Sequence, residues 1–275
     1  MPKSTMTRVI SALIGLVVFF VIALSDALVF EIALGVVILF MLFEFLSAFK
    51  FSKTLIVTAL IGSLPIIYTT LISDYALLSF SIIAYIGVLA IESVLCYKKV
   101  SFEDISKVLF ATLYISMFSS FIGLMRSTFD FGIYYLCLIF TCAWMSDTGA
   151  YFIGCLFGHK KLAPEISPKK TVAGSIGGVI FSSVGCIILG IVSVLVSKTN
   201  ANYIALAIIG IIGSVLSQLG DLTASLIKRN CGVKDFGNIM PGHGGMLDRF
   251  DSVIMIAPFV FCVCALLRFA GISVF

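Results

Sequence analysis

Long uninterrupted apolar segments run through this sequence of 275 residues and constrain its fold more than any other feature. Only 12% of the residues are charged, whereas soluble domains carry about a quarter. Runs of about 20 apolar residues cross the hydrocarbon core of a bilayer as helices. The sequence therefore predicts an all-α, polytopic membrane protein.

Polar breaks divide the chain into about nine expected transmembrane helices. We expect them near residues 9–24, 27–49, 54–72, 76–96, 107–125, 131–157, 173–196, 202–227 and 251–271. The first segment is interpreted as a retained span, because no small-residue cleavage site precedes its polar break. The predicted organisation is a region of about five spans over 1–125 and a C-terminal region over 126–275 with long polar loops at 158–171 and 228–250.

The basic residues are distributed very unequally between the two sides of this nine-span arrangement. Of the 18 Lys and Arg residues, 15 fall on the side of the N-terminus and 3 on the other side. Because cytoplasmic loops carry the Lys/Arg excess, we expect a cytoplasmic N-terminus and a C-terminus on the opposite side of the cell (inner) membrane. Any inner-membrane protein shows such a bias, so the asymmetry alone says nothing about function.

Acidic residues inside the apolar segments are the first indication of chemistry. Each costs about 2.5–3.5 kcal/mol at a helix centre on insertion scales. Asp147 lies late in the sixth segment and Asp221 in the eighth. Ser217 and Ser225 flank Asp221 at i−4 and i+4, so one stripe of that helix is polar. Such a stripe must line a cavity or tie two helices together.

Three glutamates also fall near the ends of the apolar segments. These are Glu31, Glu44 and Glu92. We interpret them as simple interfacial anchors.

The loop over 228–250 collects most of the remaining polar chemistry. Its "PGHGG" stretch provides a compact backbone that phosphates can approach, with amide groups free to donate. Asp248 and Asp251 share one face if the last helix begins there. Carboxylates bind Mg²⁺ through oxygen ligands, and nearby cations neutralise phosphate oxygens. The loop therefore has the composition that phosphoryl chemistry needs, with cations at Lys228, Arg229, Lys234 and Arg249.

The loop over 158–171 ends in "SPKKT" and adds Lys169 and Lys170 on the same side. Alone it is interpreted as a positive-inside anchor, but beside the acidic residues a role in phosphate binding competes with that interpretation. Neither a Walker GxxxxGK[ST] motif nor GxGxxG occurs in the sequence. Nucleotide binding by a P-loop or a Rossmann module is therefore excluded.

The segment "SLIKRNCGVKDFGNIMPGHGGMLDRFDS" (225–252) resembles the signature of the phosphatidate cytidylyltransferases, also called CDP-diacylglycerol synthases. "WMSDTGAYFIG", "SPKKTVAGSIGG" and "SQLGDLTAS" are similar to other blocks of that family, so the resemblance is strongest in the C-terminal half. The signature positions are filled by Ser225, Lys228, Arg229, Lys234, Asp235, Pro241, His243, Gly244, Gly245, Asp248, Arg249 and Asp251.

The resemblance implies a Mg²⁺-dependent enzyme of phospholipid biosynthesis with a polar, cytoplasmic-facing active-site cavity. In such an enzyme the phosphate of phosphatidate attacks the α-phosphorus of CTP, giving CDP-diacylglycerol and pyrophosphate. It also implies a pair of metal ions, a homodimer, membrane lipid as the surroundings and no nucleic-acid partner. On this basis the region 126–275 is expected to be catalytic.

Residue roles follow from the resemblance, position by position. The implied metal ligands are Asp221 and Asp248, with Asp251 second. The residues expected to act in catalysis are Lys228, Arg229, Lys234, Asp235, His243 and Arg249, of which His243 would orient a phosphate or the metal shell. The residues expected to bind substrate are Ser225, Lys169, Lys170, Gly244, Gly245 and Asp147.

Two other classes of function stay open at this point. A cation-coupled transporter would also place Asp147 and Asp221 inside spans, but it should show inverted repeats and broken helices. A CTP-dependent kinase for a lipid alcohol would share a CTP site, but it would need a general base for its hydroxyl nucleophile. The complete signature favours the cytidylyltransferase.

Overall fold

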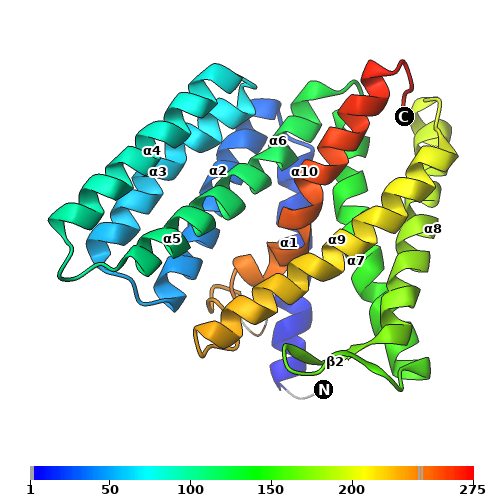
Figure 1. The fold of residues 1–275 in the computed structure, drawn as a ribbon. Coiled ribbons are helices and arrows are strands. Elements are labelled where there is room, and N and C mark those ends of the chain that lie inside the picture. The colour runs from blue at the N-terminus through cyan, green and yellow to red at the C-terminus, as the bar shows by residue number, and fades with distance from the viewer. Residues whose placement is uncertain (1–2, 241, 243) are drawn as a thin grey trace. The chain divides into compact units, whose positions relative to one another are not determined.

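The computed structural model of the protein describes residues 3–240, 242 and 244–275, and for residues 3–10 and 12 it describes the backbone alone. The chain forms two compact units, one of residues 1–124 and 231–250 and the other of residues 125–230 and 251–275. The elements are α1 (Lys3–Ala23), α2 (Ala27–Ala48), α3 (Lys53–Leu71), α4 (Tyr75–Leu95), α5 (Phe102–Ala111), the π-helix η1 (Thr112–Met117), α6 (Phe118–Thr128), α7 (Gly132–Phe157), β1 (Lys161–Ala163), β2 (Ser167–Thr171), α8 (Val172–Ser197), α9 (Tyr203–Asn230) and α10 (Leu247–Phe269) (Figure 1).

Eight helices within the described residues are long and apolar enough to cross a membrane. They are α2, α3, α4, the continuous helix over Phe102–Thr128, α7, α8, α9 and α10. The protein is therefore an all-α, multi-pass membrane protein, as the sequence predicts. The first expected span, near residues 9–24, corresponds to α1, whose described apolar part, Leu13–Ala23, is shorter than a full span.

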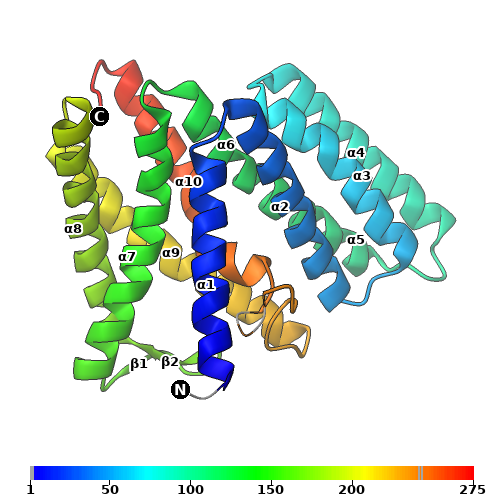
Figure 2. The same cartoon turned by 180° about the vertical axis from the view of Figure 1, so that it is seen from behind.

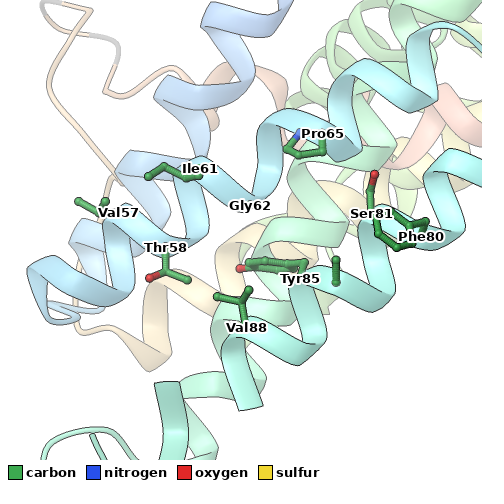
Figure 3. Close-up of a pocket in the computed structure, with 10 residues that line it drawn as sticks. Val57, Thr58, Ile61, Gly62, Pro65, Phe80, Ser81, Tyr85 and Val88 are labelled. Carbon is green, nitrogen blue, oxygen red and sulfur yellow. The ribbon is translucent and has the colours of Figure 1, made fainter. Parts of the chain in front are cut away.

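The first unit packs α2, α3 and α4 against the helix that contains α5 and η1 (Figures 1 and 2). Its interior is built from large aliphatic side chains such as Ile38, Leu42 and Ile66, none of which is exposed. Tyr85 extends from α4 toward Gly62 of α3 (Figure 3), and its hydroxyl lies 2.8 Å from Oγ1 of Thr112, the first residue of η1. A buried polar contact thus fixes α4 against the π-helix.

The second unit is built on three closely packed helices, α7, α8 and α9 (Figure 2). Small and polar residues form their contacts, as is usual where helices pack inside a bilayer. The hydroxyl oxygens of Ser146 on α7 and Ser214 on α9 lie 2.7 Å apart, and Ser182 of α8 donates to the carbonyl of Gly210 at 2.8 Å. These buried hydrogen bonds fix the register of the three helices.

The loop expected over 158–171 contains a short antiparallel hairpin of β1 and β2, which joins the end of α7 to the start of α8 (Figure 2). The second strand leads directly into α8. Thr171 has an extended backbone, and its side chain accepts a hydrogen bond from Gly174 N at 3.1 Å. A threonine that caps a helix in this way fixes the position where the helix begins.

The polar segment 231–250 belongs to the first unit, whereas the sequence-based organisation assigned it to the C-terminal region. Helix α10 begins at Leu247, so Asp248 and Asp251 lie in its first turns. This start lies before the expected boundary near residue 251 and meets the condition under which the sequence places both aspartates on one helix face.

Candidate active site

A cavity of about 340 Å³ opens in the second unit between α7, the hairpin, α8 and α9. Its lining brings together four of the charged residues that the sequence singled out. These are Asp147, Lys169, Lys170 and Asp221. The cavity falls in the size range of small-molecule sites. Acidic and basic side chains facing one cavity suit a ligand that carries both phosphates and a bound cation.

Another large cavity, in the first unit, differs sharply in chemistry. It lies between α3 and α4 and is lined by apolar side chains together with Thr58, Ser81 and Tyr85 (Figure 3). None of the described residues that line it is ionised. The cavity of the second unit is therefore the better candidate for binding phosphates, because charged side chains line it.

The hairpin delivers two lysines to the charged cavity. Lys169 and Lys170 are the last residues of β2 before the cap of α8, so the capping contact of Thr171 also fixes their backbone. Nζ of Lys170 lies 2.5 Å from Oδ2 of Asp221 on α9, and both side chains are partly exposed. Ion pairs with such access to water contribute only about 0–1 kcal/mol to stability. The pair therefore contributes little to stability, and its interest lies in placing a cation and a carboxylate together in the cavity.

Asp221 is surrounded by further polar groups on its own helix. Ser225 Oγ donates to Oδ1 of Asp221 over a long distance of 3.4 Å, one turn further along the predicted polar stripe. Lys228 and Arg229 occupy the last turn of α9, where basic residues interact favourably with the helix dipole. Nε of Arg229 lies 3.5 Å from the carbonyl oxygen of Ile166 in the hairpin. The C-terminal end of α9 is therefore positively charged.

A second carboxylate, Asp251 of α10, lies close to Asp221 because Gly220 lets the two helices approach. A Cβ at Gly220 would lie 2.6 Å from the carbonyl oxygen of Asp251, which is too close for any other residue at this backbone position. Asp251 interacts electrostatically with Asp221, and also with Lys228 and Asp147. The second unit thus gathers three aspartates and Lys228 within electrostatic range.

A fit to Mg²⁺ follows from these donors. Among the described residues, no group of three or more His, Cys, Asp or Glu side chains is close enough to hold a metal ion by itself. Mg²⁺ usually keeps several waters and is bound through one or two carboxylates together with substrate phosphates. Asp221 and Asp251, which interact electrostatically, are two carboxylates of the kind that such a site uses.

The motif residues of the first unit form a compact loop around Asp248. Oδ2 of Asp248 accepts hydrogen bonds from Phe236 N at 2.8 Å and from Gly245 N at 3.0 Å. Gly244 has a φ of +84°, and a Cβ there would lie 3.0 Å from the same carboxylate oxygen. The Gly245 amide, expected to be free for a phosphate, is thus engaged by a side chain of its own loop.

The remaining motif residues divide into exposed and undescribed positions. Lys234, Asp235 and Arg249 are exposed, so their charged groups are accessible to a ligand. His243 and Pro241 lie outside the described residues.

Glu44 is the residue whose role the sequence interpretation missed. It is only 4% exposed, and its carboxylate accepts hydrogen bonds from Met246 N at 3.0 Å and Leu247 N at 2.9 Å. A carboxylate bound to the first amides of α10 neutralises unpaired donors and the positive end of the helix dipole. The interpretation of Glu44 as a simple interfacial anchor is therefore wrong. Its partners lie 202 and 203 residues away in the sequence, at positions that hydropathy cannot reveal.

Similarity to known proteins extends over nearly the whole chain. The family described as "Cytidylyltransferase family" matches residues 6–267. This chain belongs to the cytidylyltransferase family. A phosphatidate cytidylyltransferase from Bacillus subtilis (strain 168) is 35% identical over 266 residues, which cover 94% of this chain and 97% of that protein.

Two staphylococcal relatives show the same extent of similarity. The phosphatidate cytidylyltransferase of Staphylococcus saprophyticus is 36% identical over 265 residues, covering 91% of this chain and 95% of that protein. The one from Staphylococcus aureus (strain COL) is 34% identical over 263 residues, with the same coverage of 91% and 95%. The resemblance inferred from the motif is thus confirmed, and it extends over nearly the whole chain.

Proposed function

We propose that this cytidylyltransferase transfers the cytidylyl group of CTP to phosphatidate, giving CDP-diacylglycerol and pyrophosphate. The observation that carries the proposal is the cavity of a membrane-spanning unit in which Lys169 and Lys170 face Asp147 and Asp221. A lipid phosphate and a nucleoside triphosphate both carry negative charge, which the two lysines can neutralise. Membership of this family favours cytidylyl transfer over the lipid-alcohol kinase and the cation-coupled transporter.

The reaction forms one bond and breaks one bond at the same phosphorus atom. A phosphate oxygen of phosphatidate bonds to the α-phosphorus of CTP, while the bond from that phosphorus to the oxygen bridging the β-phosphate breaks. The attacking oxygen is already anionic, so no strong general base is required. The protein therefore contributes by positioning the two substrates and by stabilising negative charge.

The lysines of the hairpin have the clearest role in this scheme. Lys169 and Lys170 bind phosphate oxygens in the cavity, and Lys228 and Arg229 extend the same positive charge along the end of α9. Ser225 orients Asp221 through its hydroxyl. Lys234, Asp235, His243 and Arg249 keep the catalytic roles that the motif implies, as do Gly244 and Gly245 in substrate binding.

We propose that Asp221 and Asp251, both in the second unit, hold Mg²⁺. The ligand role that the resemblance implies for Asp248 stays a prediction. When bound, this ion would neutralise phosphate oxygens and favour departure of pyrophosphate. The ion pair of Lys170 with Asp221 supports this assignment, because a cationic group already lies against the Asp221 carboxylate in the cavity.

The cellular arrangement follows the charge asymmetry of the sequence. We propose a protein of the bacterial cell membrane, with its N-terminus and the charged cavity on the cytoplasmic side, where CTP is available. The homodimer stays a prediction that a mass measurement in detergent or nanodiscs would test.

The decisive experiment supplies purified protein with phosphatidate, CTP labelled at the α-phosphorus, and Mg²⁺. We expect the label to appear in CDP-diacylglycerol and pyrophosphate to be released in equal amount. Parallel reactions replace phosphatidate by diacylglycerol or by a polyprenol and use CTP labelled at the γ-phosphorus, which is the group that a kinase would transfer. Phosphorylation of either alcohol, without transfer to phosphatidate, would establish the kinase alternative and refute the proposal.

A further inference from the structure

The side chain of Gln218 is held in a single orientation at the wall of the charged cavity. Its Nε2 donates to the carbonyl oxygen of Ser175 at 3.2 Å and to Oγ of Ser214 at 3.1 Å. Gln218 is only 8% exposed, and it lines the cavity together with Asp221. Ser214 is itself fixed by its 2.7 Å contact with Ser146. Three helices therefore hold this amide.

The same contacts decide which end of the amide faces the cavity. A backbone carbonyl such as that of Ser175 can only accept, so turning the amide over would place two acceptors against each other. No described residue donates a hydrogen bond to Oε1 of Gln218. Oε1 is not among the fully buried unpaired atoms, in contrast to Oγ of Ser217, so it keeps some access to solvent. A side chain that lines the cavity therefore carries a fixed, uncharged acceptor.

A fixed acceptor in a nearly buried position requires a donor from the ligand, because an unpaired buried polar group is costly. Phosphatidate offers phosphate and ester oxygens, and the triphosphate of CTP offers phosphate oxygens, so at neutral pH these groups mainly accept. The donors available are those of the nucleoside, namely the exocyclic amine of cytosine and the ribose hydroxyls.

We propose that Gln218 reads the cytosine base, with its Oε1 accepting a hydrogen bond from the exocyclic amine. This inference rests on the proposed function, because an enzyme that selects CTP must distinguish cytosine from uracil, which carries a carbonyl oxygen in place of the amine. Among the described side chains that line the cavity, Gln218 provides the one uncharged carbonyl acceptor. Gln218 precedes Asp221 by three residues, about 4.5 Å along α9, so base and phosphates occupy neighbouring parts of one cavity.

The arrangement predicts strong discrimination against UTP. Uracil would lose the hydrogen bond and would also bring its own acceptor against Oε1, which cannot turn away. Sites built to hydrogen-bond one substrate group reject analogues that lack it by as much as about 10⁴- to 10⁵-fold. Gln218 is thus a specificity-determining residue for the nucleotide.

The test compares wild type with Gln218→Leu and Gln218→Met, which keep an apolar side chain but remove the acceptor. We measure kcat/KM for CTP, dCTP and UTP with phosphatidate, together with CTP and UTP binding by thermal shift. We expect kcat/KM for CTP to fall about 10- to 100-fold, in line with the loss of one substrate hydrogen bond, while that for UTP stays constant or rises. The difference between the thermal shifts caused by CTP and by UTP should also become smaller in these variants.

Two further variants separate base reading from a structural effect. Ser214→Ala removes one of the two contacts that orient the amide, so the preference for CTP over UTP should fall, but less than in Gln218→Leu. Ser182→Ala alters a buried hydrogen bond of the same helices away from the cavity, and we expect the CTP to UTP ratio to stay at the wild-type value.

Equal losses for CTP and UTP in the Gln218 variants would overturn the inference, as would a change confined to the ratio of CTP to dCTP, which would assign Gln218 to the ribose. If the variants are too unstable for kinetics, an unchanged binding preference in Ser214→Ala would also count against it. Failure of wild type to convert phosphatidate and CTP would instead refute the proposed function, so the two failures are distinguishable.

Discussion

Lys170 of β2 and Asp221 of α9 form an ion pair of 2.5 Å at the wall of the charged cavity. A residue expected to bind phosphate and a residue expected to bind metal thus neutralise each other. If Asp221 holds Mg²⁺ and Lys170 binds phosphate as proposed, the ion would compete with Lys170 for the carboxylate, and phosphate oxygens would compete with Asp221 for the ammonium group. Joint binding of metal and nucleotide would then replace one ion pair by two sets of contacts, which would favour binding of both together.

Removal of the Lys170 charge should therefore impair catalysis far more than stability. We expect Lys170→Met to lower kcat/KM about 30- to 1000-fold, which corresponds to about 2–4 kcal/mol of lost charge stabilisation. The matched control is Lys161→Met, which removes an exposed lysine from β1 of the same hairpin outside the cavity lining. Steady-state kinetics of both variants check the prediction, and equal activity of the two would remove Lys170 from the site.

Asp221 should be indispensable and its role should depend on metal. Asp221→Asn keeps the size of the side chain but weakens binding to a hard cation, so we expect at least a 100-fold loss of activity, on the order of the loss of one preorganised charged group. When activity is measured as a function of Mg²⁺ concentration, the variant should reach half-maximal activity only at a much higher concentration than wild type, or should not saturate at all. The control Glu103→Gln breaks the exposed ion pair with Lys107 and should behave as wild type. A wild-type Mg²⁺ response in Asp221→Asn would contradict the ligand role.

The sequence predicts those parts of the site that interrupt an apolar pattern. Asp147 and Asp221 are identifiable because charges inside spans are costly, and the helices follow because apolar length specifies them. Glu44 and Gln218 could not be assigned in this way, since their roles depend on backbone groups contributed by other helices and loops. The approach of Asp251 to Asp221 depends likewise on one glycine at a helix contact.

Glu44 should stabilise the first unit rather than take part in chemistry. Glu44→Ala removes two charge-assisted hydrogen bonds to the start of α10, each contributing about 1.5–3 kcal/mol. We expect a clear fall in the thermal unfolding midpoint in detergent, with a smaller fall for Glu44→Gln, which can still accept one hydrogen bond. Glu31→Gln, near the other end of α2, serves as the control. Equal unfolding midpoints for Glu44→Ala and Glu31→Gln would show that the capping contacts contribute little.

The proposed topology places Lys169 and Lys198 on opposite sides of the membrane, because α8 (Val172–Ser197) separates them. Single cysteines at these positions, in a background without the eight native cysteines, should react differently with a membrane-impermeant maleimide. In intact cells we expect labelling at position 198 alone, and in inside-out vesicles at position 169 alone. Labelling of both positions from one side would refute the arrangement.

Gly220 provides the most stringent test of the carboxylate pair, because its contribution is purely steric. In Gly220→Ala the new methyl group would lie 2.6 Å from the carbonyl oxygen of Asp251 and 3.1 Å from Cβ of Met255. The helices α9 and α10 must then separate, which costs about 1–3 kcal/mol when a packed interior is overfilled.

Such a shift moves Asp251 away from Asp221, so we expect a lower unfolding midpoint and weaker Mg²⁺ activation in the same variant. Gly87→Ala is the matched control, since it makes the same change inside α4 where no atom lies within 4 Å. Alanine is favoured over glycine in helices by about 1 kcal/mol, so this control should match or exceed wild-type stability at full activity. Normal Mg²⁺ activation in a folded Gly220→Ala protein would show that the close approach of α10 is not needed to hold the metal.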